Sequence, residues 1–385
     1  MNNTVLIKVS SIFKPIIGPN RYVSGIGRST YQLLKAIGNL DNIPFNIILY
    51  GAGLSSIHSN ANDLRFPYRC FPLPMKLGNR ITKLEPYFIN NVYKHDLLHI
   101  PHNYDYALSR RMNFVVTIHD TCDYDTAIVN SDIDKTKVWR FAAETSRRIV
   151  TCSQSTKNDI LDRFQVPEDK VVVIPWGIST DLFHPVEGYK IDQVRKKYNL
   201  KEHYFLAVSC SNRRKNIANL LEAYRNYSKK RDSASMVLLW SNPPQDVLVA
   251  NKYEIEKGKI RFIDYVTDED LVALYNGALA TMYPSRYEGF GFPILESFAC
   301  GTPVMTCKNS SLYEVGGDYA VYVGEDNIDE MTKTMEYFCD SDLDKSQFYD
   351  KVRDHLYKFS WENTARLYVD FYKQTIDNSN IQRCY

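Results

Sequence analysis

The chain has 385 residues, too many for one compact core and a suitable length for two domains of ordinary size. Apolar residues make up 44% of the chain and charged residues 24%, a composition that excludes disordered and collagen-like architectures. The net charge is +6 in residues 1–178 (21 Lys and Arg, 15 Asp and Glu) and −4 in residues 179–385 (26 and 30), so neither half is basic enough to indicate nucleic-acid binding.

The N-terminal residues predict a buried strand. The apolar run before Lys8 has only three residues, so we expect no secretory signal there. No apolar run along the chain approaches the ~18 residues that cross a bilayer. The eight cysteines are dispersed without a Cys-x-x-Cys pair, which favours reduced thiols over a disulfide framework or a zinc site. These features together predict a cytoplasmic protein.

Short runs of β-branched and aromatic residues alternate with longer helical stretches. Runs without polar alternation are typical of strands buried on both faces, and strands separated by helices form parallel sheets. In the first half the expected strands are 4–9, 46–50, 97–100, 114–118, 148–151 and 171–174. In the second half they are 204–208, 236–240, 260–263, 278–283 and 303–306. Two such series predict an α/β protein with two doubly wound domains.

A linker between the domains is expected at residues 176–185, where a strand is followed by Gly177, a Ser-Thr-Asp run and Pro185. This boundary gives an N-terminal domain over residues 1–178 and a C-terminal domain over residues 179–360. Both domains then have the size of an ordinary single core.

The sequence beyond residue 358 predicts a helix over 359–372, with Ser360 as its N-terminal cap. Its apolar face is expected to consist of Leu367, Val369 and Phe371. We expect the third segment, residues 361–385, to cross back to the N-terminal domain.

The most informative stretch, residues 283–304, leaves an expected strand, passes a glycine-rich turn and enters a helix near Pro293. Glu288 lies in the turn and Glu296 in the helix. An isolated Glu-x7-Glu pair usually consists of two solvated surface acids. Here the pair lies where open α/β sheets bind ligands, beside glycines and a helix start that let an anion approach. We therefore predict that the two carboxylates bind separate hydroxyls of an extended ligand.

The segment from Glu288 to Glu296, Glu-Gly-Phe-Gly-Phe-Pro-Ile-Leu-Glu, resembles the signature of the retaining glycosyltransferases of family 4 (GT4), which have the GT-B fold. Further segments similar to this family follow one another in the family's order. They are Gly25–Arg28, Thr117–Asp120, Val150–Ser155, Pro175–Ile178, Arg214–Asn216, Ser310–Val315 and Phe359–Glu362. The resemblance implies two Rossmann-like domains whose parallel sheets face each other across a cleft, the N-terminal domain binding the acceptor and the C-terminal domain the nucleotide sugar.

The resemblance also implies a role for individual residues. Glu288 would accept hydrogen bonds from the donor sugar, and Glu296 would hold both ribose hydroxyls with its two oxygens. Backbone N–H groups of the glycine-rich turn would contact sugar and phosphate. The other residues assigned to donor binding are Gly25, Gly27, Gly289, Phe290, Gly291, Phe292 and Leu295.

The basic pair Arg214 and Lys215 matches the family's phosphate-binding residues. A departing nucleoside diphosphate gains negative charge, and without a metal ion that charge needs cations and N–H donors. The alternative for these residues is an exposed basic loop. Residues 209–212, Ser-Cys-Ser-Asn, stand where many relatives have a glycine followed by Arg or Thr, so part of the phosphate cradle departs from the family pattern.

His119 matches the family histidine that contacts the donor sugar near its reacting carbon, and it is not assigned as a general base. In such enzymes the acceptor attacks the face that the phosphate vacates, and the departing phosphate oxygen takes the proton. We expect no metal and no cofactor apart from the donor substrate. Gly25 and Gly27 lack the third glycine of a dinucleotide site, because Thr30 stands there.

The resulting prediction is a retaining hexosyltransferase of surface-polysaccharide synthesis that acts on a glycan or a lipid-linked acceptor. The Arg-Lys-Asn version of the basic motif most resembles enzymes that use GDP-mannose. A UDP-sugar donor, a GT-B-shaped sugar-nucleotide epimerase and a non-catalytic glycan-binding homologue remain open as alternatives. A dinucleotide-dependent oxidoreductase is disfavoured by the missing glycine.

Residues 75–84 mix basic and apolar side chains in the positive half of the chain. They suggest peripheral contact with an anionic membrane surface, as in relatives that act on lipid-linked acceptors. The neighbouring prolines and Gly78 disfavour a long amphipathic helix, so an acceptor-side loop is the favoured alternative.

Overall fold

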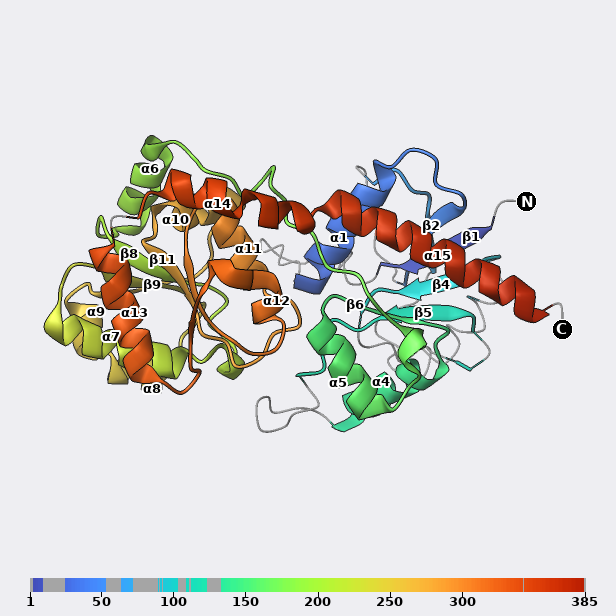
Figure 1. Cartoon of the computed structure of the whole chain (residues 1–385), viewed down its shortest axis with the longest axis horizontal. Coiled ribbons are helices and arrows are strands. Elements are labelled where there is room, and N and C mark those ends of the chain that lie inside the picture. Colours follow the sequence, from blue (N-terminus) through green and yellow to red (C-terminus); the bar gives the residue numbers. More distant parts are fainter. Residues whose placement is uncertain are drawn as a thin grey trace. The chain divides into compact units, whose positions relative to one another are not determined.

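The computed structural model describes residues 3–9, 25–52, 64–71, 89, 91, 93–102, 109, 110, 112–122, 133–341 and 343–383. These residues form two compact units, each built on a parallel sheet (Figure 1). The first unit contains the described residues up to Gly177 and those from Ser360 on, and the second runs from Ile178 to Phe359. Residues 75–84, the suggested membrane-contact segment, lie outside the described residues.

The first unit has seven parallel strands in the order β3-β2-β1-β4-β5-β6-β7. The strands are β1 (Thr4–Lys8), β2 (Asn46–Ala52), β3 (Tyr68–Phe71), β4 (Leu97–Ile100), β5 (Phe114–Thr117), β6 (Ile149–Thr151) and β7 (Val171–Val173). The described helices are α1 (Gly25–Gly38), α4 (Ile133–Thr145), α5 (Gln154–Phe164) and α15 (Trp361–Arg383), with a 3-10 turn at Glu168–Lys170. The strands β4, β5 and β6 are buried at every residue, which explains their lack of polar alternation.

Helix α15 belongs to the first unit and packs against α1. The predicted cap is confirmed, because the Ser360 hydroxyl accepts a hydrogen bond from the Asn363 N–H (3.1 Å). The predicted apolar face is wrong at Leu367, which is 46% exposed; Val369 is half-buried and Phe371 is buried. At 3.6 residues per turn, Leu367 lies to one side of the face that is buried. The buried face consists of Thr364, Ala365, Tyr368, Phe371, Tyr372, Thr375 and Ile376.

The second unit has six parallel strands in the order β10-β9-β8-β11-β12-β13. The strands are β8 (Tyr204–Ala207), β9 (Ser235–Leu239), β10 (Ile260–Ile263), β11 (Ala280–Tyr283), β12 (Val304–Cys307) and β13 (Val321–Val323). The helices before β11 are α6 (Gly188–Tyr198), α7 (Ile217–Lys230), α8 (Gln245–Ala250), α9 (Lys252–Glu256) and α10 (Asp268–Gly277). Those after it are α11 (Phe292–Ala299), α12 (Leu312–Gly316), α13 (Ile328–Asp340) and α14 (Lys345–Lys358), and 3-10 turns occur at Arg213–Lys215 and Gly317–Tyr319.

The predicted pair of parallel α/β domains is confirmed, and each of the eleven expected strands has a counterpart within a few residues. The prediction missed β3 and β13. Both are short strands at the edge of their sheets, and the apolar run of β3 is interrupted by Arg69. Among the described residues, no helix combines the length and the apolar character needed to span a bilayer.

Candidate functional site

In the second sheet the strand order reverses between β8 and β11. These two strands are neighbours in the sheet, although the side chains of Lys215 and Glu288 that follow them are 73 residues apart in the sequence. Open α/β sheets bind ligands beyond the carboxyl ends of strands at such a switch point. Lys215 follows β8 and Glu288 follows β11. The N–H of Arg286 donates to the Arg214 carbonyl oxygen (2.8 Å), so the backbone itself joins the two loops.

The predicted residues Arg214, Lys215 and Glu288 meet in one buried cluster, which we call the ion triad. Lys215 Nζ lies 2.6 Å from Glu288 Oε1, and the Arg214 guanidinium forms a salt bridge with Glu288 Oε2. The side chains of Lys215 and Glu288 are only 8% and 7% exposed. Arg214 also donates to the carbonyl oxygen of Tyr287 (2.8 Å). A buried lysine paired in this way contradicts the alternative of an exposed basic loop.

The two cations keep Glu288 ionised. Burial on its own raises the pKa of this carboxyl, but the charges and hydrogen bonds of Lys215 and Arg214 outweigh burial and lower the pKa to about 2. Burial also lowers the pKa of the Lys215 ammonium, and Glu288 opposes that effect. A carboxylate with such a low pKa accepts hydrogen bonds at neutral pH and is poorly suited to donate or take up a proton.

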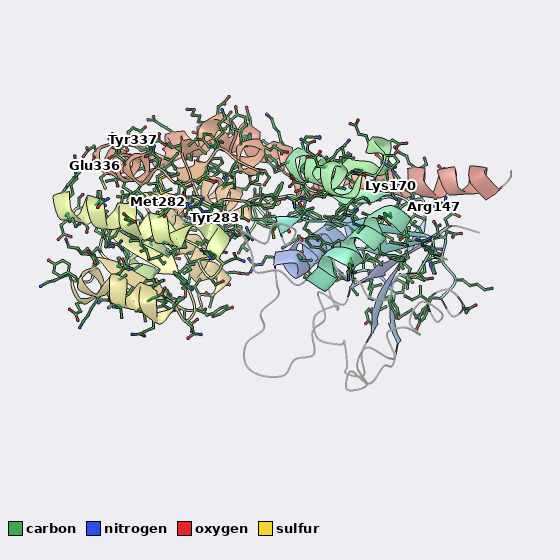
Figure 2. All side chains as sticks on the ribbon, turned by 90° about the horizontal axis from the view of Figure 1, so that it is seen from below. Arg147, Lys170, Met282, Tyr283, Glu336 and Tyr337 are labelled. Atoms are coloured by element: carbon green, nitrogen blue, oxygen red, sulfur yellow. The ribbon has the colours of Figure 1, made fainter. Side chains whose placement is uncertain are left out.

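Three polar residues that the sequence analysis did not single out complete the surroundings of the triad. Lys215 Nζ donates to the Tyr283 hydroxyl (2.9 Å) and lies 4.8 Å from the centre of its ring; Tyr283 is labelled in Figure 2. The Ser285 hydroxyl donates to Glu288 Oε1 (2.7 Å), and the Glu288 N–H donates to the Ser310 hydroxyl (3.0 Å). The family-like segments already contained Ser310, and Tyr283 and Ser285 lie just before Glu288, but no spacing rule distinguishes them.

Helix α11 begins directly after the glycine-rich turn. Gly291 precedes it with φ 106°, a left-handed conformation that favours glycine, and no side chain caps the first turn. Pro293 lies in the first turn, as predicted. An uncapped helix start attracts anions through its N–H groups and dipole. The side chain of Leu295 is fully buried, so only the backbone of this residue is available for donor binding.

Glu296 lies in α11, one turn beyond the helix start, and is half-buried. The hydroxyl of Tyr275 from α10 donates to Glu296 Oε2 (2.8 Å). Because Tyr275 is fully buried, this bond anchors the Glu296 side chain to a rigid part of the unit. Gly289, Phe290 and the helix start thus occupy the stretch between the two glutamates, as the sequence indicated.

In the first unit, His119 follows β5 and is buried. Its Nε2 lies 3.0 Å from the carbonyl oxygen of Pro101 and therefore donates to it, and its ring stacks with Trp176 (centroids 5.5 Å apart, planes at 22°). Burial lowers the pKa of the His119 imidazole, which favours its neutral form at physiological pH.

Gly25 and Gly27 form the first turn of α1. Both glycines therefore belong to the helix itself. Within α1, the Ser29 and Thr30 hydroxyls both donate to the Ile26 carbonyl oxygen (3.0 and 2.8 Å). A Cβ at Gly25 would meet no described atom within 4 Å.

Ser209 departs from the family pattern and has left-handed backbone (φ 56°) on an exposed loop. Because this conformation is costly for residues other than glycine, Ser209→Gly is expected to raise the free energy of unfolding by about 0.5–1 kcal/mol. Chemical denaturation measures the change. Ser209→Ala is the control, since it removes the hydroxyl and keeps the Cβ; an equal gain in both variants would contradict backbone strain as the cause.

In the part of the chain that the structure describes, no group of three or more His, Cys, Asp or Glu side chains is arranged to hold a metal ion. The described site contains two cations, a carboxylate and a helix start at the carboxyl edge of a parallel sheet. These are the groups that bind and stabilise a diphosphate with attached sugar hydroxyls.

Two family models match the chain. "Glycosyl transferases group 1" matches residues 190–355, and "Glycosyltransferase Family 4" matches residues 23–182. The chain is 27% identical to the O-antigen chain mannosyltransferase B of Escherichia coli over 386 aligned positions, which cover 95% of this chain and 100% of that protein. It also spans 29–30% of the length of three longer E. coli mannosyltransferases.

Solved structures show the same fold. A glycosyltransferase from Rickettsia africae ESF-5 is 20% identical with a TM-score of 0.74, over 98% of this chain and 99% of that one. An Anabaena protein solved with UDP and glucose is 12% identical with a TM-score of 0.71, over 97% and 100% of the two chains. Together with the family models these similarities confirm the resemblance noted in the sequence: the chain belongs to the GT4 glycosyltransferases (glycosyl transferases group 1) and has the GT-B fold.

Proposed function

We propose that this glycosyltransferase transfers a mannosyl group from GDP-mannose to a glycan or lipid-linked acceptor in surface-polysaccharide synthesis, with retention of the anomeric configuration. The similarity to an O-antigen mannosyltransferase over nearly the whole chain supports the sugar and the setting. The observation that carries the chemistry is the ion triad at the switch point of the second sheet.

In this proposal the second unit binds the donor and the first unit the acceptor. Lys215, Arg214 and the N–H groups at the start of α11 hold the diphosphate. Glu288 accepts hydrogen bonds from hydroxyls of the sugar, and Glu296 holds the ribose. His119 contacts the sugar near its anomeric carbon.

The reaction breaks the bond between the anomeric carbon and the phosphate oxygen and forms a bond to the acceptor oxygen on the same face. The acceptor proton passes to the departing phosphate oxygen, so no protein side chain needs to act as a base. The low pKa of Glu288 supports this assignment, because a general acid or base needs a pKa closer to the working pH. Catalysis then consists mainly of positioning and of stabilising the charge on the diphosphate.

A UDP-sugar is the second candidate donor, since a protein of the same fold was solved with UDP and glucose. The epimerase and the non-catalytic alternatives predict different fates of the donor. An epimerase converts the donor sugar without any acceptor, and a glycan-binding homologue leaves the donor intact. The proposed enzyme works in the cytoplasm, with peripheral membrane contact through residues 75–84 as a further option to be tested by salt-dependent liposome binding.

A thermal-unfolding panel with GDP, UDP, GDP-mannose and UDP-glucose tests the donor. A nucleotide at 100 times its Kd adds about 2.7 kcal/mol to the free energy of unfolding, an effect that is easily measured. We expect GDP and GDP-mannose to raise Tm and the uridine nucleotides to leave it unchanged. The opposite result would replace GDP-mannose by a UDP-sugar as the donor.

The proposed independence of metal ions is tested in a transfer assay with donor and acceptor. Donor turnover is expected to be unchanged by EDTA, because cations of the protein take the place of a divalent ion. Loss of activity with EDTA and its return with manganese would contradict this part of the proposal. Incubation of the donor alone, followed by analysis of the sugar, distinguishes the transferase from an epimerase.

A further inference from the structure

The indole of Trp176 stacks with two other rings of the first unit. The His119 imidazole lies 5.5 Å away with planes at 22°, and the Tyr368 phenol lies 5.9 Å away with planes at 15°. All three side chains are buried, with exposed fractions of 7% for His119, 2% for Trp176 and 0% for Tyr368. We call them the aromatic stack. It links residues that come from three distant parts of the sequence.

Helix α15 supplies Tyr368 and is fastened to the segment that carries Trp176. The Thr364 hydroxyl donates to the carbonyl oxygen of Pro175 (2.7 Å). A Cβ on Gly177 would lie 2.3 Å from the Trp361 nitrogen, so the absence of a side chain allows the start of α15 to lie directly against this segment. The segment Pro175–Gly177, to which the proposed function assigns no role, is therefore the docking site of α15 within the first unit.

Tyr368 is also held from the sheet side. Its hydroxyl lies 3.3 Å from the Thr117 hydroxyl at the end of β5, and Thr117 lies 2.8 Å from Nε2 of the buried His99. Since Thr117 precedes His119 by two residues on the same strand end, α15 and the His119 backbone are fixed to each other. The position of the Tyr368 ring is thus determined before any ligand binds.

The stack acts on the plane of the His119 ring. The bond from Nε2 to the Pro101 carbonyl oxygen fixes the position of one atom of the imidazole, and the ring plane depends in addition on the tilt about that atom. A stacked indole restricts that tilt, because near-parallel rings lose contact when one rotates. Side chains that act on a substrate generally depend on such supporting contacts.

We propose that Trp176 and Tyr368 are positioning residues that fix the plane of the His119 ring, so that α15 contributes to the contact between His119 and the donor sugar. This inference rests on the proposed function of His119. It assigns no contact between substrate and Trp176 or Tyr368.

A double-mutant cycle tests the inference in the full-length chain. Tyr368→Leu is expected to lower kcat about 10-fold with little change in KM, because a misplaced group mainly weakens transition-state contacts. In the His119→Ala background the same change is expected to have no further effect on kcat. An equal loss in both backgrounds would overturn the inference, because Tyr368 would then act independently of His119.

Two variants serve as matched controls. Tyr368→Phe keeps the stacked ring and loses only the hydroxyl, so kcat is expected to stay within about twofold of the original. Phe371→Leu removes another buried ring from the same face of α15, one that meets Tyr368 edge-on (72°), and is expected to leave kcat unchanged. If Phe371→Leu reproduced the effect of Tyr368→Leu, general loosening of the helix would be the cause and the positioning role would be overturned.

A measurement without substrate separates this inference from the proposed function. In protein labelled with 13C at histidine Cε1, the signal of His119 is identified among those of eight histidines by its absence in His119→Ala. Tyr368→Leu is expected to shift the His119 signal, and Phe371→Leu to leave it in place. If Tyr368→Leu does not fold, Tyr368→Met, which also removes the ring, gives the same comparison. An unshifted signal overturns the positioning role, whereas full activity of His119→Ala overturns the function proposed for His119 and this inference with it.

Discussion

Lys215→Ala is expected to lower kcat by about 100-fold or more, because it removes a buried cation from the site where the diphosphate gains charge. The effect should fall on kcat more than on KM, since the charge develops only as the bond to the sugar breaks. Steady-state kinetics with saturating acceptor measures both constants. A loss below about threefold would contradict the assignment of Lys215 to the leaving group.

The control for this variant is Lys230→Ala. Lys230 is also a lysine in a salt bridge of the second unit, with its Nζ 3.3 Å from Glu336 Oε1, but its side chain is 61% exposed. Exposed ion pairs contribute little to stability, so kcat and Tm of this variant are expected to remain close to those of the original protein. The comparison separates the loss of a functional cation from the loss of any lysine.

Glu288→Gln is expected to lower kcat by about 100-fold and the free energy of unfolding by about 3 kcal/mol. The amide has nearly the shape of the carboxylate, but it leaves the charges of Lys215 and Arg214 in a buried place without their counter-charge. Kinetics and urea denaturation at neutral pH measure the two effects. A stable variant without activity would mean that Glu288 matters for the substrate alone, and an active variant would contradict its contact with the sugar.

The pH dependence of that stability difference follows from the pKa of Glu288, which the fold lowers from its ordinary value of 4.5 to about 2. A carboxyl with a lowered pKa stabilises the folded state fully above its unfolded pKa, and this stabilisation is lost as the pH falls toward the folded pKa. The difference in unfolding free energy between the original protein and Glu288→Gln should therefore be constant between pH 7 and 5.5 and smaller at pH 3. An equal difference at pH 7 and pH 3 would contradict the ion triad.

The sequence predicts the sheets well because their strands are buried on both faces and carry continuous apolar runs. It misses β3, whose apolar run is interrupted by Arg69, and the three-residue edge strand β13. Of the three residues expected on the apolar face of α15, Leu367 is exposed. The spacing of a few apolar residues in a helix does not determine which side of the helix is buried. The rotation of the helix about its own axis decides which side is buried, and only the packing of Tyr368 and Tyr372 reveals that rotation.

The candidate site is predictable in part for a different reason. Glu288 and Glu296 lie eight residues apart on one turn and helix, so local spacing is enough to group them. The link from Glu288 to Lys215 spans 73 residues and rests on the resemblance to GT4 enzymes, since no pattern in the sequence pairs two loops at the ends of β8 and β11. Tyr283 and Ser285 stayed unassigned because buried polar side chains have no periodicity that marks their partners.

The placement of α15 in the first unit has a consequence for the order in which the protein acquires its structure. The described residues of the second unit form one continuous stretch, Ile178–Phe359, and the strands described in it are all available once that stretch has left the ribosome. The first unit, although it begins earlier in the chain, lacks the buried faces of Tyr368 and Tyr372 until α15 has been synthesised. During translation we therefore expect the later unit to reach its native packing first, and the earlier one to expose apolar surface to chaperones for longer.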